Sequence, residues 1–171
     1  AEYIGRKYCV SCANGTDALQ LALMIWGVGP GGAVFTSNFT YFASAGTTSI
    51  LGGTPVFVDI NLDTFNMSPD DLEVQIQRVI KEGKLTPKAI VPVDLFGQPA
   101  DYNKILPIAE KYGLKVLEDA AQGFGGKIHD KKAGAFGDLS ATSFFPAKPL
   151  GCYGDGGAIF TDDAEVDNRL R

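Results

Sequence analysis

The strongest constraint on the fold is the alternation of short apolar runs with helical patterns along most of the chain. Short apolar runs bounded by turn residues are typical of buried strands, and apolar residues at helical spacing are typical of helices. The expected strands lie at residues 8–13, 33–37, 54–60, 88–95, 114–119, 139–145 and 158–161. The expected helices lie at residues 18–26, 41–51, 69–82 and 101–112. This order predicts βαβ units, and therefore an α/β fold with a mainly parallel sheet.

The helix expected after Ser68 carries the clearest start and stop signals. Ser68 is a good N-cap, Pro69 suits the first helical position, and Gly83 is typical of a helix end. One apolar stripe is expected to face the core, formed by Leu72, Ile76, Val79 and Ile80.

Length and charge narrow the class of protein. The 171 residues are enough for one domain or a large part of one, and both ends resemble the interior of a longer polypeptide. A net charge of −5 without a dominant basic patch argues against nucleic-acid binding and against binding to anionic membranes. No apolar run has membrane-spanning length, and no signal-peptide pattern is present. Three cysteines, an odd number, favour a reducing cytoplasm.

Cys9 and Cys12 form a CxxC pattern that resembles a metal motif only superficially. If both lie on a strand, the odd spacing sends the two thiols to opposite faces. No second CxxC exists to complete a zinc site. We therefore expect structural cysteines and no metal site.

Lys148 stands in an unusual frame. Pro146 and Pro149 flank it, and glycines follow up to Gly157, so the backbone here is shaped by fixed and permissive φ angles. A crowded lysine can lose its proton and attack a carbonyl to form a Schiff base. A solvated loop lysine is the plainer interpretation. The only histidine, His129, leaves no Ser-His-Asp triad.

Several polar groups follow expected strands, where α/β folds bind their ligands. These groups are Gly15, Thr16, Tyr41, Asp119, Gln122, Ser143 and Lys148. Each suits one part of pyridoxal 5'-phosphate (PLP). Backbone amides at a helix N-terminus, near Gly15 and Thr16, would hold the phosphate together with the hydroxyls of Thr16 and Ser143.

The remaining groups suit the ring of the cofactor. Asp119 would keep the pyridine nitrogen protonated, and Lys148 would carry the aldehyde and then move protons. Tyr41 would stack on the ring, and Gln122 would bond near the phenolic oxygen. Simpler roles are also open: Thr16 as a helix cap, Asp119 as a turn acid, Tyr41 as a core residue and Ser143 as strand filling.

Four segments resemble the DegT/StrS family of nucleotide-sugar aminotransferases. They are residues 11–19, 55–59, 118–122 and 143–151, which occur in family order. The resemblance implies the three-layer αβα large domain of a fold-type-I PLP-dependent transferase, covering residues 1–171. It also implies an N-terminal arm and a small C-terminal domain that are not in this sequence.

The family transfers an amino group, usually from glutamate, to a keto-sugar on a nucleoside diphosphate. Its lysine matches Lys148, its pyridine-facing acid Asp119, and its stacking aromatic Tyr41. Gln122, Ser143 and the pair Gly15-Thr16 match its remaining cofactor ligands. The sequences of residues 14–17 and 148–157 are most similar to those of members that act on UDP-linked 3-keto-N-acetylglucosaminuronate in the synthesis of surface polysaccharide. A homodimer, with a partner asparagine at the phosphate, is implied for the full-length protein.

Two departures from the family affect the sugar rather than the cofactor. Asp94 stands where many members have histidine, and Asp155 where many have glutamate. Three other functions are weighed against this one. A PLP-dependent sugar dehydratase would have histidine in place of Lys148, so Lys148 argues against it. A nucleotide-binding oxidoreductase would need a glycine fingerprint between strand and helix, and none fits. The third is a fragment that binds cofactor without catalysis.

Overall fold

A seven-stranded sheet forms the centre of the molecule, and the computed structural model describes all 171 residues. The strands are β1 (Tyr8–Cys12), β2 (Gly32–Ser37), β3 (Thr54–Val58), β4 (Thr86–Val91), β5 (Lys115–Asp119), β8 (Leu139–Ser143) and β9 (Gly157–Thr161). Their order across the sheet is β1-β9-β8-β5-β4-β2-β3. Only β9 runs antiparallel to its neighbours, β1 and β8. The prediction of a mainly parallel sheet is confirmed.

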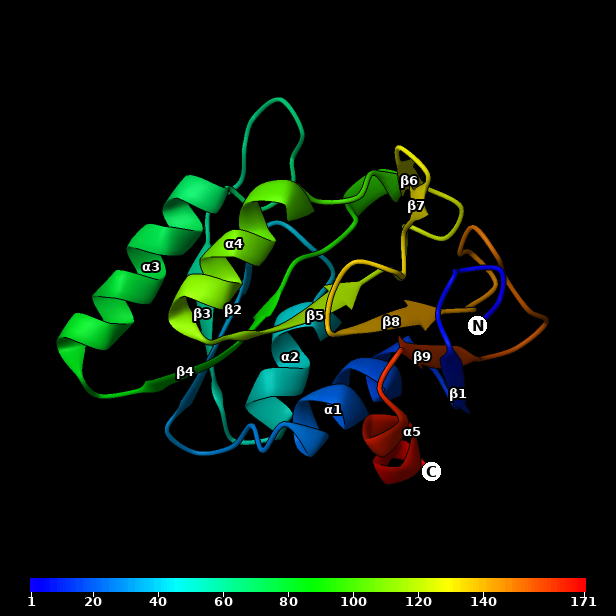
Figure 1. Ribbon diagram of the computed structural model, residues 1–171, viewed down its shortest axis with the longest axis horizontal. Coiled ribbons are helices and arrows are strands. Elements are labelled where there is room, and N and C mark those ends of the chain that lie inside the picture. Colours follow the sequence, from blue (N-terminus) through cyan, green and yellow to red (C-terminus); the bar gives the residue numbers. More distant parts are fainter.

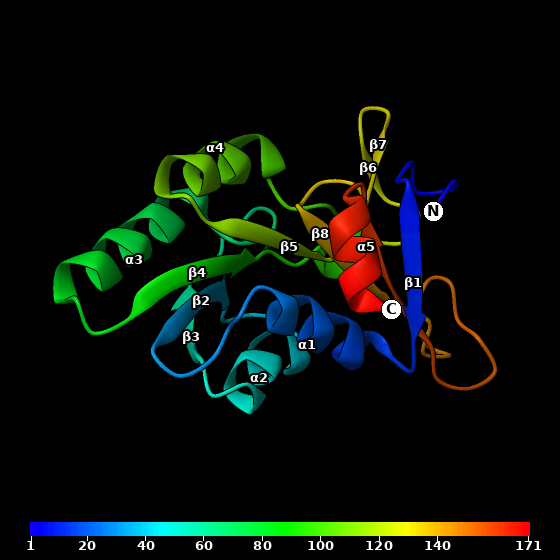
Figure 2. The same ribbon diagram turned by 60° about the horizontal axis from the view of Figure 1, so that its bottom comes forward.

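Helices cover both faces of this sheet, as Figures 1 and 2 show. The helices are α1 (Gly15–Ile25), α2 (Ala43–Ile50), α3 (Pro69–Glu82), α4 (Tyr102–Tyr112) and α5 (Ala164–Leu170). Helices α3 and α4 pack on one face, over a core that includes Phe35, Ile76 and Ile105. Helices α1 and α2 pack on the other, over a core that includes Leu23 and Leu117. None of the helices combines the length and hydropathy needed to cross a membrane.

Helix α3 begins and ends where the sequence predicts. The Ser68 hydroxyl accepts a hydrogen bond from the amide of Asp71, and Gly83 ends the helix with φ 65°. Leu72, Ile76 and Val79 are buried. Ile80 is 51% exposed, so its place in the apolar stripe was predicted wrongly. The apolar stripe is one residue narrower than expected, because Val79 faces the sheet and the next residue, Ile80, is turned away from it.

The strand expected at residues 88–95 is shorter at its carboxyl end. β4 ends at Val91, and Pro92, which has no amide proton for a ladder, follows it. Leu95 begins the 3₁₀ turn η1 (Leu95–Gly97), in which Phe96 has φ 57°. The glycine-rich residues 125–137 contain a hairpin, β6 (Lys127–Ile128) with β7 (Lys131–Lys132).

The two cysteines of the CxxC pattern lie apart. Cys9 packs against the small cluster that includes Ile4 and Phe160, whereas Cys12 packs against the core under α1. Both thiols are free. The predicted opposite orientation of the two side chains on β1 is therefore confirmed.

Candidate active site

A cavity of about 580 Å³ opens at the carboxyl ends of the parallel strands. It is lined by every residue that the sequence predicts to hold the cofactor: Gly15, Thr16, Tyr41, Asp119, Gln122, Ser143 and Lys148. These residues come from five separate segments of the chain. The structure therefore brings the predicted groups together in one place, while their chemical roles remain predictions.

The N-terminus of α1 forms one wall of the cavity. Asn14 caps the helix, because its side-chain oxygen accepts a hydrogen bond from the amide of Asp17 at 2.8 Å. The amides of Gly15 and Thr16 precede it and have no acceptor within the helix. Gly15 lies directly on Ser143: a Cβ at position 15 would come within 2.6 Å of the Cβ of Ser143. This wall is suited to an anion, because free amides and the helix dipole meet a hydroxyl there.

Asp119 ends β5 and is nearly fully buried. Its Oδ2 accepts a hydrogen bond from the Ser44 hydroxyl of α2 at 2.8 Å, and its Oδ1 accepts one from the amide of Ala121 at 3.2 Å. Burial raises the pKa of Asp119, while these two hydrogen bonds and the positive charge of Lys148 act in the opposite direction. A cation placed in the cavity would stabilise the ionised carboxylate further.

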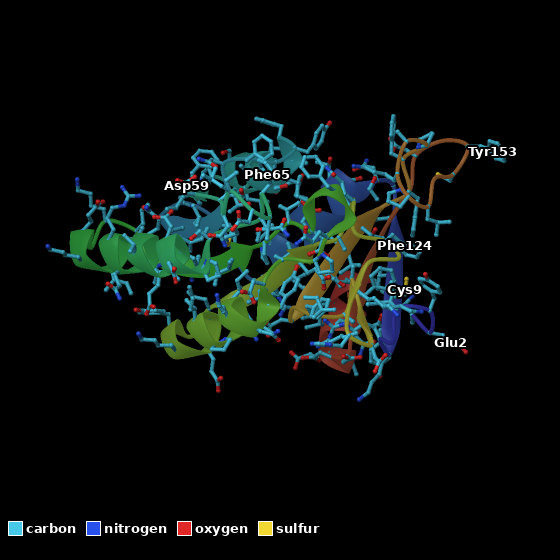
Figure 3. The ribbon with its side chains drawn as sticks, turned by 90° about the horizontal axis from the view of Figure 1, so that it is seen from above. Glu2, Cys9, Asp59, Phe65, Phe124 and Tyr153 are labelled. Atoms are coloured by element: carbon cyan, nitrogen blue, oxygen red, sulfur yellow. The ribbon has the colours of Figure 1, made fainter.

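Lys148 lies in the loop after β8 and is half-buried. Its Nζ is 5.8 Å from the centre of the Tyr41 ring and has no ion-pair partner. The backbone amide of Lys148 donates to Phe145 O at 2.8 Å, which closes a turn beside Pro146. Tyr41 is 68% exposed, so the plain interpretation of Tyr41 as a core residue is wrong. Tyr153, farther along the same loop, projects away from the body of the molecule (Figure 3).

Gln122 joins the cavity to the turn after β4. Its side-chain oxygen accepts a hydrogen bond from the amide of Phe96 at 3.2 Å. The amide nitrogen of Gln122 is thereby left as the free donor of the side chain. A donor in this place suits an oxygen of a bound ring.

Sequence reasoning missed Ser44 as a site residue. The hydroxyl reaches Asp119 across 75 positions of sequence, and nothing local marks it except its place one turn after Thr40 and Tyr41. The two residues that differ from the family pattern lie in different places. Asp155 lines the cavity, whereas Asp94 is fully buried and does not line it.

The assembled groups fit PLP. An anion site at the start of α1, a buried carboxylate and a lysine without an ion-pair partner match its phosphate, ring nitrogen and aldehyde. The close contact of Gly15 with Ser143 supports this fit, because a side chain at position 15 would displace the phosphate wall.

Comparisons with known proteins agree with this geometry. UDP-2-acetamido-2-deoxy-3-oxo-D-glucuronate aminotransferase of Pseudomonas aeruginosa is 53% identical over the whole chain, which spans 46% of that protein. A crystal structure of a DegT DnrJ EryC1 StrS aminotransferase from Brucella abortus is 57% identical, with a TM-score of 0.98 over 99% of this chain and 46% of that one. NtdA from Bacillus subtilis, solved with bound cofactor PMP, is 34% identical with a TM-score of 0.86, over 99% of this chain and 36% of that one.

The chain spans less than half the length of these relatives. The model of the DegT/DnrJ/EryC1/StrS aminotransferase family matches all of the chain, residues 1–171. The chain belongs to the DegT/DnrJ/EryC1/StrS aminotransferase family.

Proposed function

We propose that the full-length polypeptide is a PLP-dependent aminotransferase. It would move an amino group from an amino acid, most simply glutamate, to a keto-sugar carried by a nucleoside diphosphate. The observation that carries this proposal is the meeting of Lys148 and Asp119 in one cavity, where the positive charge of the lysine opposes part of the rise that burial causes in the pKa of the acid. A lysine and a buried carboxylate are the two groups that PLP chemistry needs at opposite ends of the ring.

The residues of this chain would divide the work of holding the cofactor. The amides of Gly15 and Thr16, with the hydroxyls of Thr16 and Ser143, would bind the phosphate. Asp119 would hold a proton on the ring nitrogen, because an ionised acid in a buried site favours a paired cation. When bound, PLP supplies an aldehyde and a ring that accepts electrons.

Two further residues would act at the ring. The Tyr41 ring would pack on one side of the cofactor, and the amide of Gln122 would donate to its phenolic oxygen. The Nζ of Lys148 would face the aldehyde end of the cofactor, and its neutral amine would carry a proton between donor and acceptor atoms.

The acceptor that we propose is UDP-3-keto-N-acetylglucosaminuronate. We propose that the reaction takes place in the cytoplasm and that its product is used to make surface polysaccharide. The name of the Pseudomonas aeruginosa relative supports this sugar.

We also propose that residues 1–171 form the PLP-binding large domain and that the full-length enzyme is a homodimer. Phe39, Phe65 and Phe96 contact one another and stay 43–70% exposed, which supports a covered surface here.

The test uses the full-length polypeptide and its Lys148→Ala variant, titrated with PLP. The wild type is expected to develop the visible absorption band of covalently held cofactor, and the variant is expected to lack it. Lys84→Ala, which removes an exposed lysine far from the cavity, is the matched control and should behave as wild type. Identical spectra for wild type and Lys148→Ala would remove Lys148 from its proposed role.

The substrate is tested separately. UDP- and dTDP-linked keto-sugars are offered with glutamate to the complete enzyme, and amino-sugar products are detected by mass. Turnover of the UDP-linked 3-keto-uronate above the others is the expected outcome. Loss of water from the sugar without gain of nitrogen would instead favour the dehydratase relatives.

A further inference from the structure

Two carboxyl side chains lie buried on the side of the sheet that α3 and α4 cover, and neither lines the cavity. Successive residues of a strand point to opposite faces, so Glu118 points toward α4 while Asp119 points into the cavity. Asp94, which follows β4, lies on the same side as Glu118. Both Asp94 and Glu118 are fully buried. Two adjacent buried carboxylates would repel each other strongly, so one of the two carboxyl groups is expected to keep a proton.

Hydrogen-bond donors reach three of the four carboxyl oxygens. The two oxygens of Glu118 accept hydrogen bonds from the amides of Gly134 and Phe136. Oδ1 of Asp94 accepts from the Tyr102 hydroxyl at 2.8 Å and from the amide of Ala100 at 3.1 Å.

Oδ2 of Asp94 has no donor, although it is buried. Gly123 closes the space beside this oxygen, since a Cβ at position 123 would lie 2.8 Å from it. A buried oxygen without a donor is costly as an acceptor but not as a hydroxyl that donates.

We propose that Asp94 is protonated on Oδ2 at neutral pH and donates that hydrogen to Glu118, forming one acid–carboxylate pair that positions the ends of β4 and β5 beneath the cavity. The donors decide which residue holds the proton. Both oxygens of Glu118 already accept from amide hydrogens, which favours the ionised form of that carboxyl, whereas Oδ2 of Asp94 has no donor and is the oxygen with room for a proton.

The surrounding charges agree with this assignment. Burial, followed by the negative charge of Glu118, raises the pKa of Asp94 well above its usual range, against the opposing hydrogen bonds from Tyr102 and Ala100. Burial also raises the pKa of Glu118, but hydrogen bonds from Asp94 and two amides and the charge of Arg6 oppose it. The titratable groups that face the pair are Arg6, Tyr102 and, through Tyr102, Asp119.

The pair would reach the cavity through the backbone. The amide of Asp94 donates to the carbonyl of Asp119 at 3.0 Å. Two residues later, the amide of Phe96 donates to the side chain of Gln122. A displaced Asp94 would therefore shift both proposed cofactor ligands. Asp94 is on this view a positioning residue, and this last step rests on the proposed function.

The first experiment compares two isosteric variants of the full-length protein by chemical unfolding without cofactor. Asp94→Asn keeps every hydrogen bond, because its amide nitrogen donates to Glu118 and its oxygen accepts from Tyr102. Glu118→Gln turns an amide nitrogen toward one of the two backbone amides. We expect Asp94→Asn to be at least as stable as wild type, and Glu118→Gln to have an unfolding equilibrium constant at least about tenfold larger. Equal stabilities, or the reverse order, would overturn the proposal.

The pH dependence gives a second readout. A group whose pKa is raised in the folded state keeps a proton that the unfolded chain releases above its ordinary value, near pH 4. The wild type should therefore lose stability relative to Asp94→Asn as pH rises above about 4, by up to about tenfold in the unfolding constant per pH unit. Infrared difference spectra at neutral pH should show a protonated carboxyl that Asp94→Asn lacks. Its absence in wild type would refute the pair directly.

Cofactor binding separates this inference from the proposed function. If the pair positions the ligands, Glu118→Gln should bind PLP more weakly than Asp94→Asn. Equal PLP affinity of the two folded variants would overturn the positioning role. If the wild type itself fails to bind PLP, the proposed function fails, and the infrared and unfolding results still decide the pair.

Discussion

Asp119 illustrates how a single hydroxyl can tune a buried acid. Burial favours the neutral form of its carboxyl, and the Ser44 hydroxyl is one of two hydrogen-bond donors that favour the charged form. If the charged form of Asp119 holds the cofactor nitrogen, the hydroxyl of Ser44 supports catalysis without touching the ring. Its effect should then be visible in how activity depends on pH.

Ser44→Ala tests this step. Removal of the donor takes away an influence that lowers the pKa of Asp119, so that pKa should rise. The acid limb of the kcat/KM profile should move to higher pH, and activity at neutral pH should fall about tenfold, the cost of one hydrogen bond to a charged group.

Thr47→Ala is the matched control for Ser44→Ala. Thr47 is buried one turn later in α2, and its hydroxyl donates to the carbonyl of Ala43 without reaching Asp119. The control should change stability but leave the pH profile in place. An unshifted acid limb in Ser44→Ala would show that the hydroxyl does not act on Asp119.

At the scale of elements, the contact between α1 and β8 forms the wall to which we assign the phosphate. Gly15→Ala would place a methyl 2.6 Å from the Cβ of Ser143, so the helix and the strand end must separate. We expect at least tenfold weaker PLP binding and a loss of about 1–3 kcal/mol in stability from overpacking. Fluorescence titration with PLP measures the first effect, and urea unfolding the second.

Gly154→Ala is the corresponding control, because an added Cβ there meets nothing within 4 Å. It lies in the loop after Lys148 and should bind PLP as wild type does. Wild-type affinity in Gly15→Ala would place the phosphate elsewhere.

The elements were predictable where local chemistry determines them. Ser68 and Gly83 bound α3 as expected, because caps act through neighbouring backbone groups. The convergence of Lys148 and Asp119 was also predictable, since parallel strands place their carboxyl ends at one edge.

Individual side-chain pairs between distant segments were not predictable. Ser44 bonds Asp119 across 75 positions, and Asp94 meets Glu118 on the far face of the sheet. No periodicity in one sequence encodes these pairings.

At the scale of the whole molecule, Arg6 joins three regions that are far apart in sequence. Its guanidinium donates to the carbonyls of Gly134 and Gly137 and binds Asp162 at 2.8 Å. The side chain of Arg6 is only 8% exposed, so its loss would leave the buried carbonyl of Gly137 without its donor. The carbonyl of Gly134 would keep the Ser140 hydroxyl as a donor, and Asp162 would keep the amide of Lys7. Figure 2 shows that the N-terminal segment, the hairpin β6–β7 and β1 lie at the same end of the molecule.

Arg6→Ala is therefore expected to destabilise the protein by about 3 kcal/mol at pH 7, because it leaves the buried carbonyl of Gly137 without a donor and removes the charged partner of Asp162. Part of this effect should depend on pH. Burial acts to raise the pKa of Asp162, but the hydrogen bonds from Arg6 and from the amide of Lys7 lower it overall. A lowered pKa gives stability that is present above the unfolded value, near pH 4, and is lost as pH falls through the folded value.

The difference between wild type and Arg6→Ala should accordingly be smaller at pH 3 than at pH 7, and urea unfolding at the two pH values measures it. The matched control is Arg78→Ala. Arg78 also pairs with an acid, Glu82, but at 3.8 Å and with its side chain 54% exposed, so its loss should cost less than about 0.5 kcal/mol at either pH. If Arg6→Ala costs no more than this control, Arg6 does not hold the three regions together, and the other contacts of the N-terminal segment keep it in place.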